Sequence, residues 1–308
     1  MRAVAEAPSK VIVTGEHFVV HGAWALAAAL PRKVRVEVSG ASAYAVISDR
    51  LPGRSLDLAP LGRVIDAIGR EYSVSTSVRV KVRSEVPEGA GLGSSASTMV
   101  ALASAFAKFH SIRLGLDEVI EFSMTGEREV HGKPSGIDPT ICAIGGVVLF
   151  RPGSRPRKVR LRGRRSVIVS FSGVNRSTRG QIGRVSQTRE EHPWMFGRLT
   201  ESISRLSLSA SEMLVRGDLE GLGGLLAIDQ AALDSVGVSN DALDSMVDLM
   251  VSLGCYGAKL TGGGGGGSVV GVAPKAKEKS IVSGLSARGY ETFTADLPTE
   301  GVKSWLER

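Results

Sequence analysis

A glycine-rich stretch with the sequence PEGAGLGSSAS, residues 87–97, could hold a phosphate group. Glycine occupies every second position at Gly89, Gly91 and Gly93. Glycine lets the backbone adopt positive φ and approach an anion closely, and a following helix would add unpaired N–H groups and the positive end of its dipole. The stretch has neither the Gly-Lys-Ser/Thr of a P-loop nor the G-x-G-x-x-G of a dinucleotide site. A plain strand-to-helix turn therefore stays open as the alternative.

Two carboxylates lie in a second reactive stretch, GEREVHGKPSGIDP, residues 126–139. Glu127 and Asp138 flank a Gly/Pro/Ser loop that can fold them towards each other, so that one could bind a cation and the other accept a proton. The purely structural alternatives are a solvated helix face for Glu127 and, for Asp138, the N-cap of a helix that runs to Ile144. At Asp138, capping and catalysis are compatible.

Polar groups also surround a short apolar strand at residues 11–13. Lys10 stands at its edge, either as a solvated flank or as a positive group aimed into a pocket. His17 and His21 are four residues apart, but Phe18 follows His17 where the zinc metalloprotease motif requires Glu. We therefore do not predict a zinc site here.

A second glycine stretch, KLTGGGGGGS, covers residues 259–268. A glycine run is often a flexible linker. This one lies between two short strand-like segments of one domain, where a linker has no purpose. Close packing of its backbone against phosphates, or against the first glycine loop, explains it better.

Hydrophobic periodicity predicts the elements that must position these groups. A strand-rich part precedes a largely helical one, and we place the boundary near residue 165, which gives domains 1–165 and 166–308. Helices are expected at 60–72, 96–109, 117–125, 194–215, 219–232, 241–253 and 275–288. Strands are expected at 11–13, 32–38, 44–48 (with a turn at 39–41 before it), 78–83, 147–150, 159–161, 167–171 and 290–294, followed by a tail.

Length, composition and charge limit the classes of protein to which the chain can belong. The chain has 308 residues, 43% of them hydrophobic, and its longest apolar run, residues 23–30, is far too short to span a bilayer. Cys142 and Cys255 are the only cysteines, so neither a disulfide framework nor a cysteine metal cluster is expected, and a reducing cytoplasm fits best. The net charge of +7 suits an anionic partner such as a nucleotide, a phosphorylated metabolite or a nucleic acid.

The densest basic stretch, residues 155–165, places its charges at alternate positions, as in the exposed face of a strand. Only 5% of the residues are aromatic, so stacking platforms for a nucleic acid are scarce. We therefore favour a solvated strand over a nucleic-acid site.

Four blocks, in this order along the chain, resemble the GHMP superfamily of small-molecule kinases. They are APSKVIVTGEHFVVHG (7–22), the first glycine loop, GEREVHGKPSGID (126–138) and the second glycine run. The third block is similar to the segment that distinguishes the mevalonate kinases within the superfamily. Ser9 stands where glycine is common, and the last block is all glycine where the family usually has one alanine. Neither departure removes a reactive group.

The resemblance implies an α/β (α+β) protein of two domains. The N-terminal domain would be like domain 2 of ribosomal protein S5, the C-terminal domain would be ferredoxin-like, and ATP would lie in the cleft between them. The implied activity is ATP- and Mg²⁺-dependent phosphorylation of the 5-hydroxyl of (R)-mevalonate, an early step towards isoprenoids. We expect a cytoplasmic homodimer that has small-molecule partners and binds no nucleic acid or membrane.

The resemblance also assigns roles by motif position. Asp138 would be the general base, and Lys10 would keep it ionised and stabilise the developing alkoxide. Ser95 and Glu127 would be the magnesium ligands, since both offer hard oxygen donors.

Further residues would bind the two substrates. Glu16, His17 and Thr178 would line the acceptor pocket. The ATP phosphates would lie against the first glycine loop, at Pro87, Gly89, Ala90, Gly91, Leu92, Gly93, Ser94, Ser95, Ala96 and Ser97.

Two rival functions stay open at this point. One is another GHMP kinase that acts on a different small alcohol or on an already phosphorylated mevalonate. The other is a nucleic-acid-binding protein that kept the fold and lost the catalysis, which would show steeply salt-dependent binding and no ATP turnover.

Overall fold

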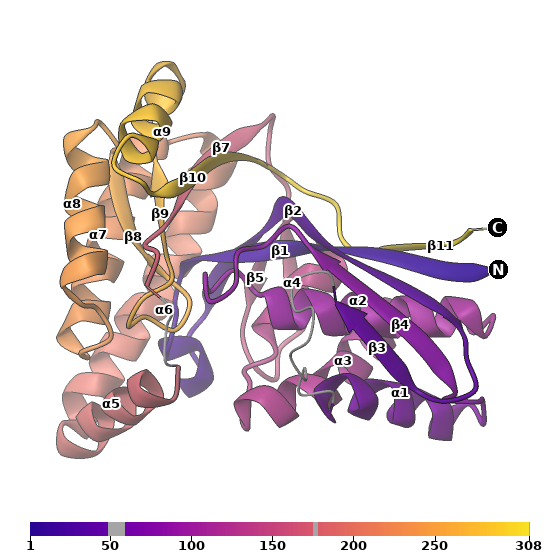
Figure 1. Ribbon diagram of the computed structural model, residues 1–308. Coiled ribbons are helices and arrows are strands. Elements are labelled where there is room, and N and C mark those ends of the chain that lie inside the picture. Colours follow the sequence, from indigo (N-terminus) through magenta and orange to yellow (C-terminus); the bar gives the residue numbers. More distant parts are fainter. Residues whose placement is uncertain (49–58, 175–177, 308) are drawn as a thin grey trace.

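The structure is a computed structural model that describes residues 1–48, 59–174 and 178–307. Two β-sheets with their helices lie side by side (Figure 1). The first sheet has the strand order β11-β1-β2-β4-β3, with β5 and β6 continuing from β2. Its strands are β1 (Arg2–Thr14), β2 (Ala25–Gly40), β3 (Ala45–Ser48), β4 (Val78–Ser84), β5 (Val147–Phe150), β6 (Arg157–Val159) and β11 (Lys303–Glu307).

Helices α1 to α4 cover one face of this sheet (Figure 1). Their bounds are α1 (Ala59–Glu71), α2 (Ser94–Phe109), α3 (Leu116–His131) and α4 (Ile137–Ile144). The strand pattern of β4 explains the layering, because Val78 and Val80 are fully buried while Arg79 between them is exposed. The helix α2 is buried along almost its whole length, so it forms the centre of this core.

Several predicted elements differ in extent or pairing. The short strand expected at residues 11–13 is part of β1, which begins at Arg2, so Lys10 lies inside a strand and not at its edge. The helix expected to end near residue 125 continues to His131. The strand β3 pairs in parallel with β4, so the turn at residues 39–41 does not make a hairpin between β2 and β3.

The second sheet has the order β10-β7-β9-β8. Helices α5 to α8 separate β7 from β8 along the chain, and α9 separates β9 from β10. This strand-helix-strand-strand-helix-strand order is the ferredoxin-like arrangement that was predicted. The elements are β7 (Arg165–Phe171), α5 (Thr178–Glu191), α6 (Pro193–Arg216), α7 (Leu219–Ser235), α8 (Asp241–Ser252), β8 (Gly257–Thr261), β9 (Ser268–Val272), α9 (Glu278–Ser286) and β10 (Glu291–Leu297).

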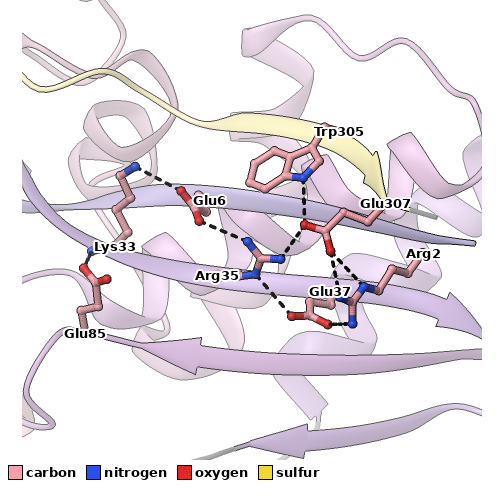
Figure 2. Close-up of polar contacts among 8 residues, drawn as sticks. All are labelled: Arg2, Glu6, Lys33, Arg35, Glu37, Glu85, Trp305 and Glu307. Atoms are coloured by element: carbon pink, nitrogen blue, oxygen red, sulfur yellow. Dashed lines mark hydrogen bonds and ion pairs between the residues drawn. The ribbon is translucent and has the colours of Figure 1, made fainter.

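The predicted tail ends in a strand, because β11 returns from the second sheet and pairs antiparallel with β1. A network of charged groups fixes it there (Figure 2). Glu307 accepts from Arg35 at 2.7 Å and from Arg2 at 3.0 Å, and Arg2 also pairs with Glu37 at 2.8 Å. The ring of Trp305 lies 5.4 Å from the Arg35 guanidinium. The chain end therefore belongs to the first sheet, and the division at residue 165 stays a prediction.

Within the described part of the chain, every helix is too short or too polar to cross a bilayer. Cys142 and Cys255 are both free and buried. Burial raises the pKa of each thiol to about 12, so neither is a reactive thiolate near neutral pH.

Candidate active site

The first glycine loop connects β4 to α2 and has the conformation that its sequence predicts. Gly89, Gly91 and Gly93 have φ of +72°, +77° and +76°, values that other residues rarely adopt. Gly93 is the N-cap of α2, so the free N–H groups of the first helical turn lie at the end of the loop. A Cβ atom on Gly93 would come within 2.7 Å of Lys10 Cγ. Glycine is therefore required where the loop passes Lys10.

Lys10 and Asp138 meet beside this loop. Lys10 Nζ is 3.0 Å from Asp138 Oδ1 and 3.4 Å from the Gly91 carbonyl oxygen, and its side chain is only 1% exposed. The solvated-flank alternative for Lys10 is thereby wrong. Asp138 is the second residue of α4, whose N-cap is Gly136, so the predicted capping role is also wrong. Its side chain remains 27% exposed and can reach a ligand.

Ser95 and Glu127 form a second pair near the start of α2. Ser95 Oγ donates a hydrogen bond of 2.5 Å to Glu127 Oε1. The Glu127 side chain is 2% exposed and lies 3.7 Å from His131 Nε2, so it is not on a solvated helix face. A hydroxyl and a carboxylate are ligands that Mg²⁺ accepts together with phosphate oxygens and water. No group of three or more acidic, His or Cys side chains that could hold a metal occurs among the described residues.

A cavity of about 560 Å³ opens beside these groups. Lys10, Glu16 and His17 from β1 and the turn after it line this cavity, together with Glu127 of α3 and Asp138 of α4. Residues from the second half of the chain also line the cavity, at Val185, Ser186, Arg189, Gly262 and Gly263. Five of the predicted site residues, namely Lys10, Glu16, His17, Glu127 and Asp138, therefore line one cavity at the junction of the two halves, whereas Ser95 is joined to it through its hydrogen bond to Glu127.

Glu16 belongs to a buried charge cluster. Lys259 Nζ is 2.6 Å from Glu16 Oε1 and 3.5 Å from Asp229 Oδ2, and the three side chains are at most 1% exposed. Burial raises the pKa of Glu16 to about 7, and the negative charge of Asp229 adds to this, while Lys259 opposes it. Burial likewise raises the pKa of Asp229. The cluster thus has two acids for one cation.

The structure describes the side chain of His17, one of the other two predicted acceptor residues, but not that of Thr178. His17 lines the cavity, has φ of +60°, and places Nε2 3.2 Å from the Gly263 carbonyl oxygen. Thr178 begins α5, but its side chain lies outside the described part of the chain.

The second glycine run packs against the first glycine loop, as one of the two interpretations expected. Ser268 Oγ donates to the Ala90 carbonyl oxygen at 2.8 Å, and a Cβ atom on Gly267 would lie 3.2 Å from that oxygen. The loop is therefore supported from the second half of the chain.

Two residues of this site, Lys259 and Asp229, were not predicted from the sequence. Lys259 is the first residue of the second glycine stretch, and no role was predicted for it. Its apolar neighbours Ala258 and Leu260 do not indicate that it pairs with a buried acid. Asp229 lies in a helix pattern where a single acid is ordinarily exposed. The spacing of Asp229 from Leu226 and Leu233 places it on the apolar face of its helix, a signal that the helix pattern alone could have given. The partners could not be read from the sequence, since Glu16 and Gly15 lie more than 200 residues from Lys259 and Asp229, respectively.

Comparison with known proteins identifies the family. Models of the GHMP kinase N-terminal domain and of the GHMP kinase C-terminal domain match residues 60–146 and 210–291. Mevalonate kinase of Aeropyrum pernix is 35% identical over 97% of both chains, and that of Methanothermobacter thermautotrophicus is 32% identical over 98% of this chain and 100% of the relative. The chain belongs to the GHMP kinases.

A solved structure agrees with this assignment. The GHMP kinase described here superposes on the Leishmania major mevalonate kinase in complex with R-mevalonate with a TM-score of 0.82, at 28% identity and over 96% of each chain. The predictions of a kinase and of the two-domain GHMP fold are confirmed, and ATP is the phosphate donor of this family. Family membership thereby disfavours the nucleic-acid-binding alternative.

Proposed function

We propose that this GHMP kinase transfers the γ-phosphate of Mg·ATP to the 5-hydroxyl of (R)-mevalonate. The observation that carries the proposal is the contact of 3.0 Å between Lys10 and Asp138 in a cavity beside the glycine loop. Relatives at 32–35% identity are mevalonate kinases, and the third sequence block favours this substrate over other small alcohols.

Asp138 accepts the proton of the acceptor hydroxyl as its oxygen attacks the γ-phosphorus, and the bond to the β,γ-bridging oxygen breaks. The positive charge of the Lys10 ammonium stabilises both the ionised Asp138 carboxylate and the alkoxide that develops on the acceptor. Because phosphoryl transfer depends mainly on positioning and charge neutralisation, no covalent enzyme intermediate is required.

Ser95 and Glu127 would hold Mg²⁺, which supplies charge neutralisation at the nucleotide phosphates. The N–H groups at the start of α2 and the glycine loop face the same region and favour anions. Glu16, His17 and Thr178 would contact the acceptor.

The test is a coupled ADP-release assay with (R)-mevalonate, phosphomevalonate and a panel of other small alcohols. Asp138→Ala should lower kcat by about 10²- to 10⁴-fold, the usual contribution of a positioned base, while ATP binding stays within twofold. Asp117→Ala, an exposed acid in the first turn of α3, is the matched control and should keep full activity. Near-normal turnover by Asp138→Ala, or a clear preference for another alcohol, would overturn the proposal.

The predictions of a cytoplasmic homodimer that binds neither nucleic acid nor membrane belong to this proposal as well. The two buried, free cysteines support a reducing compartment. Light scattering of the purified protein tests the dimer, and a monomeric mass at micromolar concentration would contradict it.

A further inference from the structure

The turn from β1 into η1 (Phe18–His21) has a strained backbone. Gly15 has φ of +97°, and His17 has φ of +60°, a conformation that residues with a side chain adopt rarely. A Cβ atom on Gly15 would come within 2.8 Å of the Ala25 Cα. Such a backbone persists only where its surroundings fix it. Glu16 lies between these two residues, so the contacts that fix the turn also place Glu16.

Contacts from the second half of the chain hold this turn, in addition to its own backbone hydrogen bonds. The Gly15 N–H donates to Asp229 Oδ2 at 3.1 Å, and Lys259 Nζ donates to Glu16 Oε1 at 2.6 Å. His17 Nε2 lies 3.2 Å from the Gly263 carbonyl oxygen. Asp229 and Lys259 are fully buried, in α7 and β8. The backbone and the side chain of the turn are thus tied to separate elements.

Glu16 keeps one oxygen for another partner. Its Oε1 is occupied by Lys259, whereas Oε2 is buried and has no hydrogen-bond partner within the described structure. A buried acceptor without a partner is unfavourable, and a bound group that donates a hydrogen bond would remove this deficit. Glu16 is also part of the cavity wall, where an alcohol would bind.

We propose that Asp229 and Lys259 are positioning residues for the acceptor alcohol. Asp229 fixes the backbone at Gly15, and Lys259 fixes Oε1 of Glu16, so that Oε2 is aimed at a hydroxyl of the acceptor. This inference rests on the proposed function, because it requires an acceptor that carries a hydroxyl group. It adds two residues of α7 and β8 to the site, neither of which lines the cavity.

The first test compares Asp229→Ala with Asp229→Asn. The alanine variant leaves the Gly15 N–H without its acceptor, and we expect KM for mevalonate to rise about tenfold or more, the usual effect of a lost hydrogen bond to a charged group. KM for ATP should stay within about twofold. The asparagine variant keeps an oxygen for the Gly15 N–H and should restore most of the affinity.

Ser207→Ala is the matched control. It removes the 2.9 Å hydrogen bond from Thr14 to Ser207, which joins the same two halves one residue before Gly15 but does not reach Glu16. It should lower thermal stability and leave KM for mevalonate unchanged. An equal rise of KM in Ser207→Ala would mean general loosening of the junction and would overturn the inference.

Lys259→Arg covers the case in which Asp229→Ala does not fold. It keeps the positive charge but moves the donor atoms, so KM for mevalonate should rise while KM for ATP does not. An unchanged KM for mevalonate in this variant contradicts the inference.

Hydrogen exchange of the amides of Phe18 and Val19 separates the inference from the proposed function. These amides donate to Glu16 and Gly15 carbonyl oxygens, and they should exchange faster in Asp229→Ala than in the wild type, whatever the substrate is. Equal exchange overturns the positioning role even when mevalonate is phosphorylated. Absence of ADP release with mevalonate in the wild type instead overturns the proposed function.

Discussion

The buried cluster of Glu16, Asp229 and Lys259 makes the stability of this enzyme depend on pH. With both acids ionised, the cluster carries one uncompensated negative charge away from water. Burial is the main reason why the pKa of Glu16 rises from its ordinary 4.5 to about 7. We therefore predict that Glu16→Gln, which removes this charge and keeps the shape, is more stable than the wild type above pH 7.

The sign follows from proton linkage. Folded Glu16 holds its proton up to about pH 7, whereas in the unfolded chain it loses the proton near its ordinary pKa of 4.5. The folded state thus binds more protons between these values, and the free energy of unfolding falls as pH rises through this window. A difference of about 2.5 pKa units corresponds to about 3 kcal/mol, which the wild type has lost above pH 7.

The assay is urea unfolding of both proteins at pH 5, 6, 7 and 8. At pH 8, Glu16→Gln should be the more stable protein by on the order of 2–3 kcal/mol, and the difference should shrink towards zero near pH 5. Glu37→Gln is the control, because Glu37 pairs with Arg2 and Arg35 and its neutralisation should destabilise at pH 8. Equal stability of Glu16→Gln and wild type at pH 8 would refute the charge imbalance.

Two more predictions follow from other contacts of the structure. Ser95→Ala removes the hydroxyl beside Glu127, so the Mg²⁺ concentration for half-maximal activity should rise several-fold at fixed ATP, and an unchanged requirement would count against a ligand role. Arg35→Ala breaks the bonds of Arg35 to Glu37 and Glu307 and should lower stability by about 1–2 kcal/mol, with faster hydrogen exchange along β11. Arg79→Ala, an exposed residue of β4, is its control, and equal exchange along β11 in both variants would contradict the role of the network.

The sequence predicted the reactive groups best where their signal is local. The positive φ values of the glycine loop, the helix after it and the alternating valines of β4 each depend on residues within one short segment. The meeting of Lys10 with Asp138 across 128 positions was predicted through the order of the motif blocks and not through periodicity.

Element ends were predicted poorly where tertiary contacts override local preference. Gly126 suggested a loop, yet it lies inside α3. Glycine is required at this helical position because a Cβ atom there would come within 2.7 Å of the Pro60 carbonyl oxygen. Close approach of α3 to α1 therefore keeps a residue of low helix propensity within the helix. The first half of β1 was not predicted, because it contains Pro8 and proline is rare within strands. The strand tolerates Pro8 because its pairing with β2 shifts register directly after this residue.

The buried acid of α7 shows why the acceptor site exceeds what sequence patterns can give. Asp229 is fully buried on the apolar face of α7, at helical spacing from Leu226 and Leu233, and the helical pattern does not show which groups would pair with a carboxylate there. Its burial is stable only because Lys259 and the Gly15 N–H come from elsewhere to meet it. The strained turn at Glu16 in turn depends on Asp229. Each side of the junction therefore satisfies groups that the other leaves unpaired, so an ordered acceptor site requires that both halves be folded and in contact.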